Sequence, residues 1–164
     1  MNMTRKRMGF VVAAIVPMVV AMQAAGSPES KSRIAETIKA QVAQIVAGIN
    51  AHDVDRATRF DADDIVSMES GRPASHGLAA EKEGLGQAFH YAPDWRLSLV
   101  EDTVDVANSG ELAVYRSTYN EDSVTDGVPM THQVNFIAEF RRQSDGQFKV
   151  AWSVVSSIEK SHRK

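Results

Sequence analysis

The first strongly periodic segment of the chain alternates apolar and polar positions with the spacing of an α-helix. Its apolar residues, separated by four, four, three and four positions, are Ile34, Ile38, Val42, Ile45 and Ile49. Side chains at these separations form one stripe along a helix that turns once every 3.6 residues. Ser27-Pro28-Glu29, a serine cap followed by proline and an acid, predicts the start of this helix.

Two further helices and a short strand are predicted between residues 53 and 89. Asp53 is a favourable cap for a short second helix from Val54 to Phe60. Ile65-Val66-Ser67-Met68-Glu69 predicts a short strand, which the glycine- and proline-containing turn after it closes. Leu78 to Phe89 predicts the third helix.

Beyond Pro93 the apolar positions recur every second residue, which is typical of β-strands. The four predicted strands are Trp95–Val106, Leu112–Asn120, Val128–Arg142 and Phe148–Ile158. Short turns rich in Gly, Asn and Asp separate them, so the strands are expected to form an antiparallel meander. Because the helices come first and the strands afterwards, the predicted fold class is α+β, in a single domain over residues 27–164.

This order of elements resembles the nuclear-transport-factor-2-like (NTF2-like) cone, and more narrowly the ketosteroid-isomerase-like, SnoaL-like and DUF4440 group. The segments that carry the resemblance are residues 45–55, residues 60–66 and the Asp-Gly hairpin within residues 140–154. The likeness covers residues 32–158. It implies three N-terminal helices packed on a strongly curved, mostly antiparallel sheet that encloses a hydrophobic pocket.

In the steroid isomerases of that group, a carboxylate at the end of the first strand shuttles the proton. The resemblance puts Glu69 at that position. It puts Ile45 where those enzymes carry a helix tyrosine, and Phe136 or Asn135 where they carry a sheet acid. The chain thus resembles the scaffold and the base of the group without its electrophile, so the resemblance does not favour steroid isomerisation.

The candidate base shares one face of the short strand with apolar neighbours. Alternation puts Ile65, Ser67 and Glu69 on the same face, which looks into the cone in the family. A carboxylate at the mouth of an apolar cavity suits a general base, because desolvation disfavours its charged form. The alternative is that Glu69 opens a solvated turn before Gly71.

Two tyrosines are the candidate hydrogen-bond donors. Tyr115, Ser117 and Tyr119 share a face of the second long strand, and the resemblance makes this face concave. Phenols there would donate to a developing oxyanion, with Ser117 beside them in the substrate pocket. The alternative is ordinary cross-strand packing, since tyrosine is common in strands.

The third long strand and the residue after Pro93 contribute the remaining candidates. His132 leads an apolar face that includes Phe136, and it is a second candidate proton carrier or else a solvated rim residue. Asn135, on the opposite face, is a candidate donor, and Trp95 is a core residue or a wall of the pocket. The predicted catalytic residues are therefore Glu69, Tyr115 and His132. The predicted substrate-binding residues are Tyr119, Asn135, Ser117, Trp95 and Phe136.

Composition and motifs narrow the chemistry. The chain has no cysteine and a net charge of −3, so it offers no thiolate site and no nucleic-acid footprint. Its five histidines form no metal-binding pair, and it contains no glycine-rich phosphate loop and no G-x-S-x-G element. We therefore expect neither a metal site nor a cofactor.

Residues 1–26 have the three parts of a secretory signal. Arg5-Lys6-Arg7 is basic, Met8 to Val20 is apolar, and Ala24-Ala25-Gly26 is a small-residue cleavage site. The alternative is a membrane anchor, which Pro17 and Gln23 disfavour by shortening the apolar core below the roughly 20 residues of a spanning helix. We therefore predict a periplasmic or secreted protein with no stable membrane span after cleavage.

Two functions are compatible with these patterns. The first is an exported, cofactor-free acid–base enzyme, of isomerase or lyase/dehydratase type, acting on a small hydrophobic cyclic or aromatic molecule. The second is a non-catalytic exported module that binds a hydrophobic ligand or a protein partner. In both cases a homodimer is expected, through the uncovered face of the sheet, where apolar residues would form a patch.

The signal-peptide prediction has a direct test. Intact mass spectrometry of the exported protein should give a chain that begins at or near Ser27. Recovery of all 164 residues from the membrane fraction would instead support the anchor.

Overall fold

The computed structural model describes residues 29–125 and 127–158, which form three helices and six strands. The helices are α1 (Lys31–Ala51), α2 (Val54–Ala57) and α3 (Leu78–Tyr91). The strands are β1 (Asp61–Glu69), β2 (Ser75–His76), β3 (Arg96–Val106), β4 (Leu112–Thr125), β5 (Val128–Arg142) and β6 (Phe148–Ser157). The predicted signal segment lies outside the described residues.

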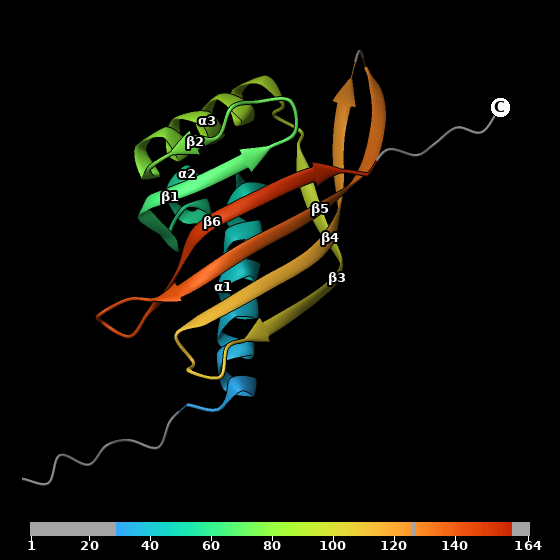
Figure 1. Ribbon diagram of the computed structural model, residues 1–164. Coiled ribbons are helices and arrows are strands. Elements are labelled where there is room, and N and C mark those ends of the chain that lie inside the picture. Colours follow the sequence, from blue (N-terminus) through green and yellow to red (C-terminus); the bar gives the residue numbers. More distant parts are fainter. Residues whose placement is uncertain (1–28, 126, 159–164) are drawn as a thin grey trace, which may run out of the picture.

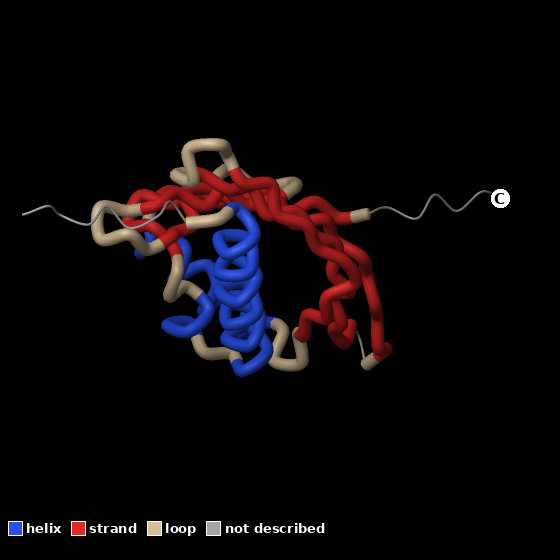
Figure 2. Tube along the Cα trace, turned by 90° about the horizontal axis from the view of Figure 1, so that it is seen from below, coloured by secondary structure: helices blue, strands red, loops and turns tan. Residues whose placement is uncertain are grey.

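The six strands form one sheet that wraps around helix α1. Their order is β2-β1-β6-β5-β4-β3, and every pairing is antiparallel except the parallel pair β1–β6. Figure 2 shows the strong curvature of the sheet, with the described helices on its concave side. The β4–β5 hairpin extends beyond its neighbours (Figure 1). The predicted α+β class and the long antiparallel meander are therefore confirmed.

Several predicted boundaries were wrong. The described helix α1 is capped by Ser30, whose side chain accepts a hydrogen bond from the Arg33 backbone, rather than by Ser27. Helix α2 ends at Ala57 rather than at Phe60, and the first strand begins at Asp61 rather than at Ile65. Strand β4 also continues past Asn120 to Thr125.

The core lies between the apolar stripe of α1 and the concave face of the sheet. Ile34 and Ile38 are completely buried, and Val42 is nearly so. The sheet residues buried in the same cluster are Ile65, Ala113, Tyr115, Tyr119, Val134, Ala138, Phe140, Phe148 and Val150. The helical period therefore predicted the buried face of α1 for Ile34, Ile38 and Val42, whereas Ile45 and Ile49 are only partly buried.

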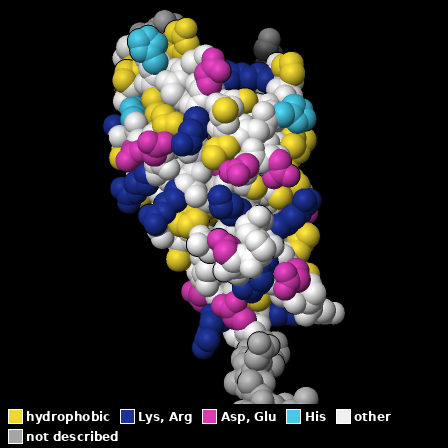
Figure 3. Space-filling model, turned by 90° about the vertical axis from the view of Figure 1, so that its left-hand side faces the viewer, with side chains coloured by type: hydrophobic (Ala, Val, Ile, Leu, Met, Phe, Trp, Pro, Cys, Tyr) yellow, Lys and Arg dark blue, Asp and Glu magenta, His cyan; other side chains and the backbone are white. Residues whose placement is uncertain are grey.

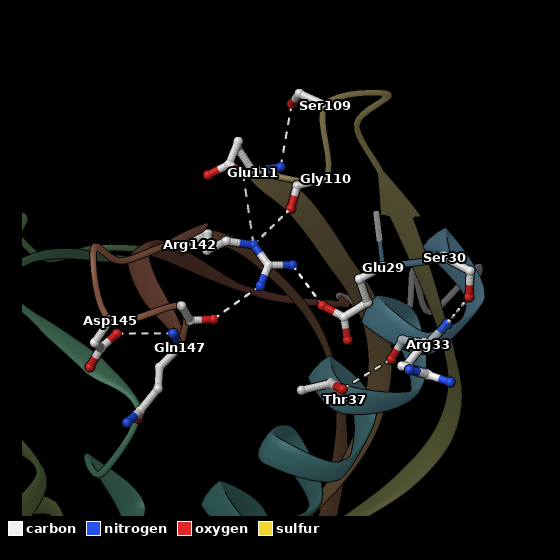
Figure 4. Close-up of polar contacts among 11 residues, drawn as sticks. Glu29, Ser30, Arg33, Thr37, Ser109, Gly110, Glu111, Arg142, Asp145 and Gln147 are labelled. Atoms are coloured by element: carbon white, nitrogen blue, oxygen red, sulfur yellow. Dashed lines mark hydrogen bonds and ion pairs between the residues drawn. The ribbon is translucent and has the colours of Figure 1, made fainter. Parts of the chain in front are cut away.

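Arg142 connects three segments at the end of the sheet where the β3–β4 and β5–β6 turns lie. Arg142, near the end of β5, donates to the carboxylate of Glu29 at 2.8 Å and to the carbonyl oxygens of Gly110 and Gly146. Figure 4 shows these contacts converging from three separate segments. The guanidinium also lies 4.4 Å from the ring centroid of Phe148, a cation–π distance. The end of the sheet opposite the β4–β5 hairpin tip is thus tied to the beginning of α1.

Helices α1 and α2 approach each other at backbone distance. Gly48, which is buried in α1, has no side chain, and a Cβ built on it would lie 2.4 Å from the backbone nitrogen of Ala57. A Cβ atom does not come within 3 Å of the backbone of another segment, so the close approach requires glycine at this position.

The outer face of the sheet is open in the described part of the chain. Arg116 and Asn135 are exposed there, and the helices that the structure describes lie on the other side. The expected homodimer stays a prediction. Among residues 29–125 and 127–158, no helix combines the length and apolar character needed to cross a membrane.

The packing of α1 generates a stability prediction. Replacing completely buried Ile38 by alanine should lower the free energy of unfolding by about 2–5 kcal/mol, because the lost methyl groups leave a cavity. Chemical denaturation measures this change. Exposed Glu36 on the same helix is the matched control, and Glu36→Ala should change stability by less than about 0.5 kcal/mol. Equal effects of the two substitutions would contradict the assigned core.

Candidate functional site

Two polar cross-links join helix α1 to the edge strand β3. Near the end of the helix, the Asn50 side chain accepts from the Leu97 backbone N–H at 2.7 Å and donates to the Leu97 carbonyl at 2.9 Å. One side chain thus satisfies both backbone groups of an edge-strand residue, as a neighbouring strand would. Three turns earlier, the Lys39 ammonium lies 2.5 Å from a carboxylate oxygen of Asp102.

A cavity of about 180 Å³ opens between these cross-links. It is lined by Lys39, Val42, Ala43 and Val46 of α1, Leu99 and Asp102 of β3, and Tyr115 and Tyr119 of β4. Four of the eight residues are aliphatic. The four others carry hydroxyl, ammonium or carboxylate groups, so the walls are apolar and the polar groups are few and specific, as in many small-molecule sites.

An irregularity in strand β3 turns Asp102 toward this cavity. The pairing register between β3 and β4 shifts between Leu99 and Glu101, which marks a β-bulge. Before the bulge, Leu97 and Leu99 face the helix. After it, Asp102 and Val104 do, so the inward side changes from odd to even residue numbers. The side chain of Asp102 is only 16% exposed and Lys39 is its ion-pair partner.

Tyr115 and Tyr119 form a buried phenol pair in the floor of the cavity. Their hydroxyl oxygens are 2.9 Å apart, and the predicted common face of Tyr115, Ser117 and Tyr119 is confirmed by their burial. Burial raises the pKa of both phenols. Hydrogen bonds with Tyr115 and Ser117 oppose this rise in the pKa of Tyr119, whereas the bond with Tyr119 adds to the rise for Tyr115. Both groups therefore remain O–H donors near neutral pH.

The geometry leaves one phenolic proton for a ligand. Only one of the two protons lies between the two oxygens, so the hydroxyl that accepts this bond keeps its own proton for another acceptor. Either hydroxyl can be the donor of the shared bond. Tyr119 is the less deeply buried of the two, 4% exposed against 1% for Tyr115, so it is the candidate donor to an oxygen atom in the cavity.

Glu69 does not lie in this cavity. It is on the same face of β1 as Ile65 and Ser67, as alternation predicted, but at the end of the strand its side chain is 52% exposed. Its carboxylate is 3.3 Å from the guanidinium of Arg72 in the following turn. The structure therefore corresponds to the alternative of a solvated turn before Gly71, and the role of Glu69 as the base stays a prediction.

The other predicted site residues divide between the interior and the surface. Phe136 is partly buried, and its ring centroid lies 6.2 Å from that of Tyr115, so it supports the phenol pair from behind. His132 is exposed on the β4–β5 hairpin, opposite Glu121 in the register. Asn135 is exposed on the outer face, where its side chain accepts from Thr118 at 3.3 Å.

Trp95 belongs to a separate aromatic cluster before β3. Its ring lies 5.9 Å from Phe89, which in turn stacks on His52 at 4.7 Å. Trp95 is not among the residues that line the cavity. Of the predicted site residues, the structure places only Tyr115 and Tyr119 in the cavity lining. Ser117 and Phe136 lie beside the tyrosines without lining the cavity, and Glu69, His132, Asn135 and Trp95 lie elsewhere.

The sequence analysis did not predict that Lys39, Asp102 and Asn50 belong to the site. A partial signal exists for two of them: Lys39 precedes Val42 and Val46 by three and seven residues, and Asp102 alternates with Val104 and Val106. Each charged residue therefore shares a face with apolar residues, which is the pattern of a polar group directed into a pocket.

A second, wider depression lies on the outer face of the sheet. It encloses about 390 Å³, and polar or charged side chains such as Glu101, Arg116 and Asn135 line it. Arg116 pairs there with Asp105 at 2.6 Å. On the face of the molecule in Figure 3, basic and acidic side chains are interspersed, without an extended patch of one sign.

Metal binding has no support in the described residues. Within them, no group of three or more His, Asp or Glu side chains is arranged to hold an ion.

Comparison with known proteins identifies the architecture. No protein-family model matches the sequence, and no curated protein matches it. Solved structures do match: a ketosteroid isomerase-like protein from Erwinia carotovora atroseptica has a TM-score of 0.64 at 22% identity, covering 76% of this chain and 96% of that chain. An NTF2-like superfamily protein from Salmonella enterica has a TM-score of 0.71 at 13% identity, covering 80% and 96%.

A third structure agrees with these two. It is an NTF2-like protein with a cystatin-like fold from Novosphingobium aromaticivorans, with a TM-score of 0.65 at 17% identity over 77% of this chain and 83% of that chain. The chain has the NTF2-like fold. The predicted resemblance is confirmed at this level. Because the NTF2-like fold carries many unrelated activities, function has to be argued from the cavity itself.

A buried carboxyl group lies elsewhere in the NTF2-like domain. Asp61, at the start of β1, is 7% exposed. Burial, together with the nearby charge of Glu81, raises the pKa of Asp61 to about 7, and the charge of Lys149 partly opposes the rise. Asp61 does not line the cavity, so its effect is expected on stability.

The raised pKa gives the sign of a pH dependence. The folded protein binds a proton at Asp61 more tightly than the unfolded chain does. The associated stabilisation is complete below about pH 4 and is lost as pH rises through about 7. Asp61→Asn should remove this loss, so the stability difference between variant and wild type should increase by about 4 kcal/mol from pH 4 to pH 8.

Denaturant unfolding at several pH values measures this difference. Asp55 is the control, because its carboxylate is exposed and the hydrogen bond with Lys82 lowers its pKa. Asp55→Asn should therefore change the pH dependence in the opposite direction. A pH-independent difference for Asp61→Asn would refute the assignment.

Proposed function

We propose that this protein is an acid–base enzyme that moves a proton on a small single-ring carbonyl compound, using its own side chains. The observation that carries the proposal is the placement of the Asp102 carboxylate and the Tyr115–Tyr119 phenol pair around one small cavity with aliphatic walls. A base and an oxyanion donor are the two groups that proton abstraction next to a carbonyl needs.

The roles follow from the chemistry of the groups. A carboxylate oxygen of Asp102 takes a proton from the carbon next to the substrate carbonyl, and the electron pair moves onto the carbonyl oxygen. Tyr119 donates a hydrogen bond to the resulting enolate, and Tyr115 and Ser117 hold Tyr119 in place. Asp102 then returns the proton, either to another carbon, which gives isomerisation, or to a leaving hydroxyl, which gives dehydration.

The size of the cavity limits the substrate class. A cavity of roughly 150 Å³ holds benzene, whereas pockets for larger organic ligands exceed about 300 Å³. The volume of about 180 Å³ therefore favours one ring and disfavours a steroid. The ketosteroid isomerase-like neighbour supports acid–base chemistry as a class, and nothing about its substrate is carried over. The proposal retains the predicted export, which the mass measurement tests independently.

Solvent deuterium exchange tests the proposal. The wild-type protein should accelerate the exchange of the α-hydrogens of small cyclic ketones such as 3-cyclohexenone, followed by proton NMR. Asp102→Asn should lower the rate by about 10²–10⁴-fold, because it removes the base while keeping the shape. Tyr119→Phe should lower it by about 10²–10³-fold, because it removes the oxyanion donor.

The matched control is Asp105→Asn. Asp105 lies on the same strand but on the outer face, where it pairs with Arg116, so this substitution should leave the rate unchanged. A large loss with Glu69→Gln and none with Asp102→Asn would return the role of base to Glu69. Binding of ketones without any exchange would favour the non-catalytic binding module.

A further inference from the structure

The Lys39–Asp102 ion pair connects the cavity to solvent. Lys39 is 38% exposed at its side chain, whereas Asp102 is 16% exposed, so the ammonium lies on the solvent side and the carboxylate on the inner side. Among the described residues that line the cavity, Lys39 is the one cation. A molecule that enters past the ammonium therefore meets a positive charge first and aliphatic walls next.

The ion pair also engages one oxygen of the proposed base. One oxygen of Asp102 accepts the Lys39 hydrogen bond at 2.5 Å, and the second carboxylate oxygen keeps its lone pairs for a proton from carbon. If Lys39 changes partner to an anionic substrate, both carboxylate oxygens of Asp102 become available for the proton transfer.

We infer that the substrate of this cavity carries a carboxylate, which Lys39 binds in exchange for Asp102. This inference rests on the proposed function, since it names the substrate class of the same cavity. The substrate is then a single-ring oxo acid: the ring lies against Val42, Val46 and Leu99, the carboxylate meets Lys39, and the carbonyl oxygen meets Tyr119.

The recognition chemistry favours a carboxylate over a phosphate group. Lys39 supplies a single point charge on a flexible stem. Phosphate sites in proteins generally combine several donors, such as an arginine fork or a series of backbone N–H groups, and no arginine is among the described residues that line the cavity. One ammonium matches one negative charge.

Binding of benzoate and benzyl alcohol to the full protein tests the inference by calorimetry. The two probes share one ring and differ in charge. The wild type should bind benzoate at least about tenfold more tightly, as expected for a hydrogen bond between charged groups. Equal affinities, tighter binding of the alcohol, or binding of neither probe would each overturn the inference.

Three variants distinguish the loss of carboxylate binding from a general loss of folding. Lys39→Met should abolish the preference for benzoate and retain the binding of benzyl alcohol. Lys82→Met is the matched control, because Lys82 forms a similar ion pair with Asp55 away from the cavity, and the preference should be unchanged. Asp102→Asn should strengthen benzoate binding by about tenfold, because it removes the competing anion.

The Asp102→Asn result remains decisive if Lys39→Met fails to fold. Weaker benzoate binding in Asp102→Asn would overturn the inference, since it would mean that Asp102 supports the ligand instead of competing with it. These measurements do not depend on turnover. A benzoate preference without deuterium exchange would refute the proposed catalysis and retain the carboxylate site. Deuterium exchange without a benzoate preference would refute the carboxylate site and retain the proposed catalysis.

Discussion

Helix α1 is held to the edge strand β3 at two points, by Asn50 on the Leu97 backbone and by Lys39 on Asp102. An edge strand has unpaired backbone groups, and Asn50 satisfies one such pair from a helix instead of from a seventh strand. The distance between helix and strand is therefore determined by the reach of two side chains. The cavity is the space that remains between those two contacts, where small and branched side chains do not fill the gap.

The curvature of the sheet supplies the other half of the site. Register shifts occur in β3 between Leu99 and Glu101 and in the β5–β6 pair between Glu139 and Phe140, and bulges of this kind increase bend and twist. The concave face that results buries Tyr115 and Tyr119 beneath the helix. Burial raises the pKa of both phenols further above neutral pH, so the packing that stabilises the domain also disfavours the loss of their protons.

The sequence allowed the regular parts to be predicted, because they depend on local periodicity. The stripe of α1 and the common face of Tyr115 and Tyr119 follow from spacings of 3.6 and 2 residues. Asp102 could not be predicted in the same way. Alternation from Leu97 and Leu99 would place it on the outer face, and only the bulge between Leu99 and Glu101 brings it to the inner face. Glu69 shows the opposite problem. Its face was correct, but its exposure depends on where the strand ends relative to the curved sheet.

Gly48 has a consequence for protein engineering. Replacing glycine by alanine inside a helix is a standard way to raise thermal stability, with a gain of about 1 kcal/mol in an exposed helix. Here the added methyl group would overlap the backbone of Ala57 and force α1 and α2 apart. Since α1 also forms one wall of the cavity, the distortion would reach the Asn50 contact two residues later. A consensus or propensity score that treats all helical glycines alike would select a damaging substitution at this position.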